Sequence, residues 1–198
     1  ALQNERLRGL ILPLAQDPAE RIRVGVFRTM IAAEERNKEV WDILTRGITD
    51  DSYTVQQMSS EVLGTQLKAG NEELEGSLIA LLADGSTTVR TAVIKSLLQS
   101  PNRSRVIRQY LSYTRTLAGW VRERALESLK AFSRDLVDPV IELMHDDDEE
   151  IRLLALVVGG NFEDERCVEP IISLLDDEDW WTRVTAAETL GRIGDRRA

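Results

Sequence analysis

A pattern that returns six times along the chain constrains its fold more than any other feature. In each copy an apolar run is followed by an aspartate, and a β-branched residue and an arginine come five and six residues later. Aligned on the basic position, the copies lie 30 to 34 residues apart, at Arg23, Gln56, Arg90, Arg122, Arg152 and Arg183. Departures are Gln56 for the arginine and Thr116 for the aspartate. Because so short a unit cannot bury an apolar face by itself, the copies are expected to stack on one another.

Each copy contains two stretches of helical periodicity, and in the last copy a short acidic turn separates them. In the last copy, the second stretch places Thr182, Ala186, Leu190 and Ile193 on one stripe, which predicts a buried helix face. Strand-like alternation is missing. The sequence therefore predicts an all-α fold, with residues 1–198 forming one domain of about six helix pairs. We expect the repeats at about 5–34, 39–68, 72–100, 103–133, 135–161 and 165–195.

Composition limits the partners and the cellular compartment that we expect for the chain. The net charge is −9, which argues against general binding to nucleic acid or to an anionic membrane. No apolar run approaches the roughly 20 residues that a membrane span requires. The single cysteine, Cys167, cannot form an internal disulfide, and no signal-peptide pattern opens the chain, so we expect a cytoplasmic protein. Without an initiator methionine, and with GDRRA at its end, the chain is expected to be a fragment of a longer protein.

The stretch DWWTRVTAAETLGRIGD at 179–195 closely resembles the HEAT-like repeats of phycocyanobilin lyases, whose second helix reads roughly W-x-V-R-x-x-A-A-x-A-L-G-x-I-G-D. The fifth copy is a fair match, and Gly47 stands at a usually apolar place in the second. The resemblance implies a right-handed α-α superhelix, or solenoid, with first helices outside and second helices lining a concave surface. It also implies an alternative function, that of a bilin (tetrapyrrole) lyase or phycobilisome-disassembly subunit.

Recurrent aspartate and arginine side chains form the strongest polar signal. In a stacked array they can hydrogen-bond from one repeat to the next, so we interpret them as a structural ladder and not as catalytic groups. The ladder comprises Asp17, Arg23, Asp84, Arg90, Arg122, Asp146, Arg152, Asp177 and Arg183.

Motifs for catalysis or cofactor binding are missing from the sequence. His145, the single histidine, lies beside an acidic run without the spacing of a metal or calcium site. Cys167 has no histidine nearby in sequence and is interpreted as a passive small residue. No serine nucleophile motif, phosphate-binding glycine loop or dinucleotide fingerprint is present. We therefore expect a non-enzymatic protein without catalytic residues, cofactor or metal.

Residues 99–134 form a basic island, with 8 basic and 2 acidic residues between acidic flanks. Arg115 and Arg124 belong to it. We consider three interpretations: a solvated surface, a site for an acidic protein segment, and a nucleic-acid channel that resembles those of HEAT-like DNA glycosylases. Trp41, Trp120, Trp180 and Trp181 start or flank predicted helices, and there aromatic rings favour packing between neighbouring turns, with anchoring of a partner as the alternative.

The fifth repeat departs from the others at two outward-facing positions. It alone is apolar at both, with Leu153 and Val157, and Leu154 lies nearby. An apolar patch rimmed by charge is typical of a partner site, and the rim here would comprise Glu123, Glu127 and Glu188. Burial under neighbouring helices is the alternative interpretation. We therefore predict a protein-binding scaffold whose concave face binds a peptide or protein carrying acidic and apolar residues.

Overall fold

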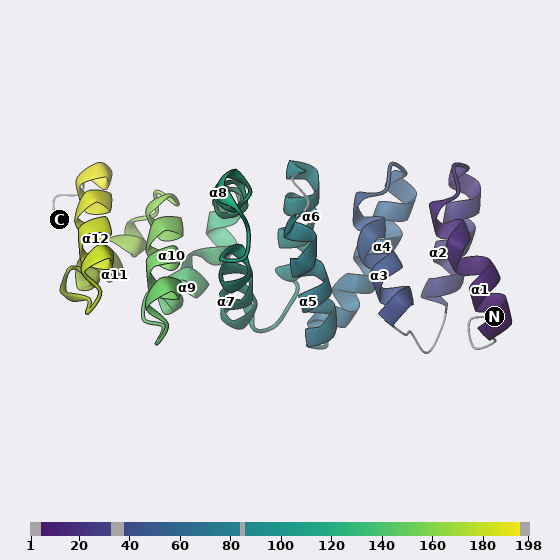
Figure 1. Cartoon of the computed structure of the whole chain (residues 1–198), viewed down its shortest axis with the longest axis horizontal. Coiled ribbons are helices and arrows are strands. Elements are labelled where there is room, and N and C mark those ends of the chain that lie inside the picture. The colour runs from purple at the N-terminus through teal and green to yellow at the C-terminus, as the bar shows by residue number, and fades with distance from the viewer. Residues whose placement is uncertain (1–4, 33–37, 84–85, 195–198) are drawn as a thin grey trace. The chain divides into compact units, whose positions relative to one another are not determined.

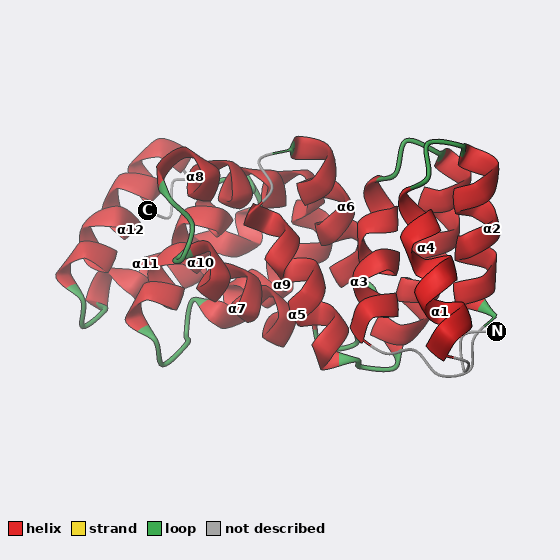
Figure 2. Ribbon diagram, turned by 45° about the vertical axis from the view of Figure 1, so that its right-hand side comes forward, coloured by secondary structure: helices red, strands yellow, loops and turns green. Residues whose placement is uncertain are grey.

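A computed structural model describes residues 5–32, 38–83 and 86–194. The chain falls into two compact units, residues 1–101 and 102–198. Throughout the described residues the regular structure is helical, with no strand, so the predicted all-α class is confirmed (Figure 2). None of the helices described is both long and apolar enough to cross a membrane.

Unit 1 consists of three helix pairs that follow one another in chain order (Figure 1). Short 3-10 turns, η1 (Leu12–Gln16), η2 (Gly47–Thr49) and η3 (Leu81–Ala83), end the first helix of each pair. The helices are α1 (Glu5–Ile11) with α2 (Glu20–Ile31), α3 (Lys38–Arg46) with α4 (Tyr53–Lys68), and α5 (Glu72–Ala80) with α6 (Thr87–Leu97). Second helices pack on second helices, since α2 contacts α4 and α4 contacts α6.

Unit 2 repeats the same plan. Its pairs are α7 (Arg103–Thr114) with α8 (Gly119–Ser128), α9 (Ser133–Leu143) with α10 (Glu149–Gly160), and α11 (Val168–Ser173) with α12 (Trp180–Ile193). Three 3-10 turns, η4 (Leu129–Phe132), η5 (Glu165–Cys167) and η6 (Leu174–Asp176), connect or extend them. Figure 1 shows α10 and α12 running beside each other, and the two helices are in contact.

Helix starts follow from local polar chemistry. At the N-caps of α10 and α12, the Asp148 and Asp179 carboxylates accept backbone N–H groups of the first turn, and Ser52, Asn71 and Asn102 cap α4, α5 and α7 in the same way. These caps satisfy donors that the first turn of a helix leaves without an intrahelical partner. The capping residues thus determine the position at which each of these helices begins.

The core of each unit lies between the first and second helices. Five of the apolar positions twelve residues before the anchors are fully or almost fully buried: Leu44, Leu78, Tyr110, Val140 and Ile171. Tyr110 also donates its hydroxyl to the Ala125 carbonyl at 2.8 Å, which satisfies its polar atom inside the core.

Helix α9 begins at Ser133, before the expected start of the fifth repeat at about 135, and Pro139 lies inside the helix. Proline lacks the N–H that would bond to the carbonyl four residues before it, here that of Asp135. Arg103 donates to this carbonyl at 3.4 Å and supplies a partner from α7.

Candidate functional site

The turn before α10 is organised by one arginine. Arg152 on α10 donates from Nη1 to the Asp146 and Asp147 carbonyls, at 2.9 and 3.3 Å, which fixes the turn of its own repeat. Its Nε and Nη2 donate to the two carboxylate oxygens of Asp177, at 2.7 and 3.0 Å, across to the next repeat. The Arg152 and Asp177 side chains are 14% and 6% exposed. One guanidinium therefore joins two repeats through a bidentate, largely buried pair.

Arg23 repeats this geometry in unit 1. It donates to the Asp17 carbonyl at 2.9 Å and to both carboxylate oxygens of Asp50, at 2.9 and 2.8 Å. In the next repeat, Gln56 stands at the anchor, and its Nε2 donates to the Asp50 carbonyl at 2.5 Å. The glutamine therefore keeps the contact within its own turn.

Other members of the predicted ladder behave differently. Arg90 is buried and donates to Thr87, whereas its predicted partner Asp84 lies outside the described residues. Arg122 donates to Glu150 at 3.2 Å. Arg183 makes only the contacts within its own turn, to the Asp177 and Glu178 carbonyls at 2.6 and 2.9 Å.

Three aspartates at these turns, Asp177, Asp146 and Asp50, have a lowered pKa. The hydrogen bond from Arg152 lowers the pKa of Asp177 against the opposing effect of burial. Arg108 lowers the pKa of Asp146 in the same way. For Asp50, burial would raise the pKa, but the hydrogen bonds from Arg23 and the Ser52 N–H outweigh it, so the pKa is lowered.

The basic island is largely neutralised within the chain. Arg108 pairs with Asp146 at 2.6 Å, and Arg115 pairs with Asp148 and Glu150 at 2.7 and 2.6 Å. Sequence reasoning missed this pairing, although the acidic run lies one repeat length after the arginines. Arg124, by contrast, is exposed and lies 3.9 Å from Glu127. Arg115 is therefore a link between repeats, which weakens its assignment as a partner-binding residue.

Three of the four tryptophans are at the surface. Trp41 is buried as the sequence predicted, but Trp120, Trp180 and Trp181 are 65%, 61% and 51% exposed. Packing between neighbouring turns is therefore the wrong interpretation for these three. They lie in the first turns of α8 and α12, where the side chains point away from the repeat core. Trp180 and Trp181 pack edge to face with ring centroids 5.2 Å apart.

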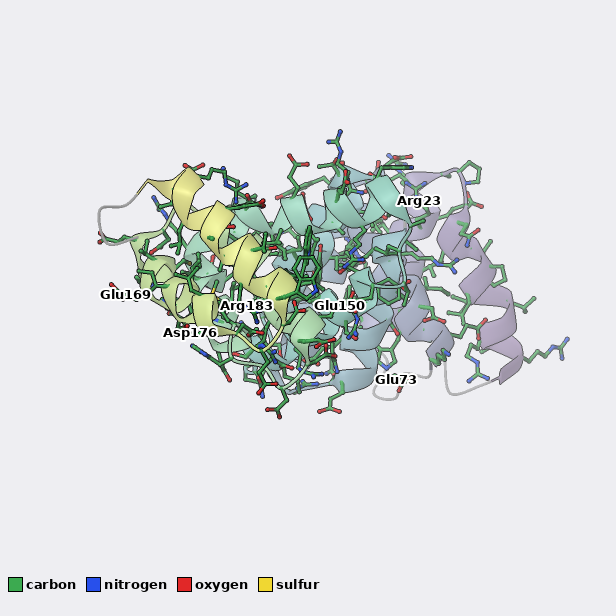
Figure 3. All side chains as sticks on the ribbon, turned by 60° about the vertical axis from the view of Figure 1, so that its left-hand side comes forward. Arg23, Glu73, Glu150, Glu169, Asp176 and Arg183 are labelled. Atoms are coloured by element: carbon green, nitrogen blue, oxygen red, sulfur yellow. The ribbon has the colours of Figure 1, made fainter. Side chains whose placement is uncertain are left out.

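Residues two before, one after and five after each anchor share one face of a second helix, because they are spaced three and four apart. In unit 2 these three positions on α8, α10 and α12 make nine. We call the set the tryptophan face: Trp120, Glu123 and Glu127 on α8; Glu150, Leu153 and Val157 on α10; Trp181, Val184 and Glu188 on α12. Figure 3 labels Glu150 on α10 and Arg183 on α12.

The structure places the predicted patch residues unequally on this face. Leu153 and Val157 on α10 are partly exposed, and Glu123 and Glu127 on α8 and Glu188 on α12 are exposed. Leu154 is only 4% exposed, because it lies two residues after the anchor and turns toward the core. It is a core residue, and its assignment to the surface patch is corrected.

Residues 137–198 match the family model described as HEAT repeats. This stretch, about a third of the chain, is similar to HEAT repeats. Comparison with solved structures finds the TOG3 domain of Drosophila melanogaster Mini spindles (12% identity, 93% of this chain and 94% of that chain, TM-score 0.46). It also finds the HEAT-like repeats protein of Thermococcus onnurineus NA1 (17% identity, 98% and 89%, TM-score 0.34). No curated protein matches the chain.

Among the residues that the structure describes, no group of three or more histidine, cysteine, aspartate or glutamate side chains could hold a metal ion. His145 is exposed. Cys167 is buried, and burial raises the pKa of its thiol to about 11. Thiolate is the nucleophilic form of cysteine, so neutral pH leaves this sulfur unreactive.

Cys167 is accordingly expected to resist alkylation by iodoacetamide in the folded protein at pH 7 and to react once the protein is unfolded in urea. Mass spectrometry of the alkylated protein measures both. Fast labelling under native conditions would contradict the burial of this side chain.

Proposed function

We propose that the chain is a non-enzymatic scaffold that binds a peptide or protein on the tryptophan face. The exposure of Trp120 and Trp181 carries this proposal. Large aromatic side chains are costly to leave in water, and they supply much of the free energy in protein interfaces. They lie on α8 and α12, the second helices before and after α10, which carries the partly exposed Leu153 and Val157.

The helices beneath this face are held in a fixed arrangement. Arg122 joins the first turn of α8 to Glu150 on α10, and Arg152 joins α10 to the turn before α12. When the helices that carry a binding surface are already held in place before binding, less conformational entropy is lost on association. The ladder therefore supports a binding surface on second helices without entering it as catalytic machinery. A bilin subunit rests on the resemblance of residues 179–195, and the described surface adds no observation in its favour.

The double variant Leu153→Glu, Val157→Lys tests the face. Peptides selected from a random display library against the native chain are expected to bind this variant about 10- to 100-fold more weakly, in line with loss of central interface contacts. Fluorescence anisotropy of labelled peptides measures the affinity, and circular dichroism checks that helical content is unchanged.

A matched control is Gln57→Glu, Glu61→Lys, which alters the equivalent two positions of α4 in unit 1. It should leave the selected peptides bound. If the selection yields only peptides that bind the unit 2 variant as tightly as the native chain, the assignment of this face is wrong.

A further inference from the structure

We infer that the occupant of the tryptophan face is a cationic and apolar segment of a partner protein, rich in arginine or lysine and in large apolar side chains. This inference rests on the proposed function and concerns the chemistry of the partner. It differs from the acidic partner predicted from the basic island.

The charges on the face itself are of one sign. Of its nine positions, Trp120, Leu153, Val157, Trp181 and Val184 are apolar, and the other four are glutamates: Glu123, Glu127, Glu150 and Glu188. No arginine or lysine occupies any of the nine. Arg124 lies next to this set on α8, and its nearest carboxylate is that of Glu127 at 3.9 Å.

Three of the arginines near the face already have carboxylate partners, whereas Arg183 donates to the Asp177 and Glu178 carbonyls and has no ion pair in the described part of the chain. Glu150 pairs with Arg115 and Arg122, and Arg152 makes its bidentate pair with Asp177. An acidic partner would have to displace these intrachain carboxylates. A cationic partner meets no such competition at Glu123 and Glu188.

Further carboxylates line the turns next to the tryptophans. Asp147 and Glu149 lie at the start of α10, and Asp176 and Glu178 lie just before α12. Across the ranges that the structure describes, none of these four side chains has an ion-pair partner, whereas neighbouring Asp146, Asp148 and Asp177 do. Because these four carboxylates are not neutralised by ion pairs, they give this edge a negative electrostatic potential. That potential attracts a cationic segment.

Exposed indole rings provide a second kind of contact with a cationic partner, in addition to the carboxylates. A guanidinium binds the face of a tryptophan and at the same time donates to a carboxylate, because its donors lie in the plane of the group. Trp181 and Glu188 lie on the same helix, two turns apart, and Val184 lies between them. An extended or helical segment can thus place arginine over an indole and an apolar side chain against Val184 and Leu153.

Three synthetic peptides of equal length test the inference. The first combines leucine and arginine, the second replaces each arginine with glutamate, and the third replaces each leucine of the first with serine. We expect the leucine and arginine peptide to bind the chain at least tenfold more tightly than either of the others, as measured by anisotropy of a labelled peptide. Its affinity should fall as salt is raised.

Two variants locate the binding. Trp181→Ala should weaken the leucine and arginine peptide at least tenfold, whereas Tyr53→Ala, an exposed aromatic at the start of α4, should not. The triple variant Glu123→Gln, Glu127→Gln, Glu188→Gln should weaken binding and flatten its salt dependence. Glu61→Gln, at the equivalent position of α4, is the matched control. Circular dichroism confirms that each variant is folded.

Several outcomes would overturn the inference. Equal or tighter binding of the glutamate peptide would show that the partner is not cationic. Unchanged binding in both the Trp181→Ala and the triple variant would show attraction to the acidic protein as a whole. Concentration-dependent self-association lost in Trp181→Ala would make a second copy the occupant. If the glutamate peptide binds as tightly as the arginine peptide, while display selection yields peptides that require Leu153 and Val157, the proposed function stands and this inference fails.

Discussion

Gly47→Ala is expected to destabilise unit 1 by about 2 to 3 kcal/mol, because the added methyl group has no space. Gly47 is buried in η2, and a β-carbon built on it would lie well inside van der Waals distance of Ser59 Oγ and Phe27 Cε1. Both neighbours are buried, so neither can move into solvent to relieve the overlap. The glycine allows η2 to approach α2 and α4 closely.

Urea denaturation followed by circular dichroism measures this change, and hydrogen exchange of the α2 and α4 amides assigns it to unit 1. Gly76→Ala is the control. Gly76 is exposed in α5, and a β-carbon there meets nothing within 4 Å, so alanine should stabilise the helix by about 0.5 to 1 kcal/mol. Equal midpoints for Gly47→Ala and the native chain would mean that the η2 packing is looser than described.

Arg152→Ala is expected to destabilise unit 2 by about 2 to 3 kcal/mol, since it leaves the Asp177 carboxylate and two turn carbonyls without their donor. The effect should depend on pH. The pKa of Asp177 is lowered in the folded protein, so the pair stabilises the fold above the ordinary aspartate pKa of 3.8. That contribution is lost as the pH falls below 3.8 through the lowered folded-state pKa.

Denaturation midpoints of the native chain and of Arg152→Ala, compared at neutral pH and below the ordinary aspartate pKa, measure both effects. The difference between them should shrink in acid. Arg183→Ala is the matched control, because Arg183 makes the same contacts within its turn but has no carboxylate partner in the described part of the chain. An equal loss for both variants would show that the carbonyl contacts, and not the ion pair, stabilise the turn.

The sequence was a good guide to the fold because the repeat period, the acidic turns and the apolar stripes all point to helix pairs. Thr182, Ala186 and Leu190 are buried on the stripe that was predicted for α12. The start of α9 was misplaced, since proline usually marks a first turn and here Arg103 compensates for it from another helix. A contact of that kind links residues distant in sequence, so local pattern does not reveal it.

The candidate site was only partly predictable. Helical spacing correctly pointed Leu153 and Val157 outward, but it placed the nearby Leu154 on the same surface, and Leu154 is buried. The exposure of three tryptophans was wrongly predicted. Whether an indole ring is exposed depends on whether a neighbouring helix covers it, and the spacing of residues along one helix does not reveal this. The expected charge of the partner also depends on ion pairs within the chain. The number of arginines in residues 99–134 predicts a basic surface, whereas Arg108 and Arg115 are neutralised by Asp146 and Asp148.

The uneven distribution of tryptophan burial gives the two units separate optical signals. Trp41, buried in unit 1, emits from an apolar environment and is shielded from dissolved iodide, whereas Trp120, Trp180 and Trp181 in unit 2 emit from water and are open to the quencher. Tryptophan fluorescence at shorter wavelengths therefore reports the unfolding of unit 1. Fluorescence at longer wavelengths, and its quenching by iodide, reports the binding of a partner to unit 2. A single unlabelled sample can thus report folding of one unit and occupancy of the other at the same time.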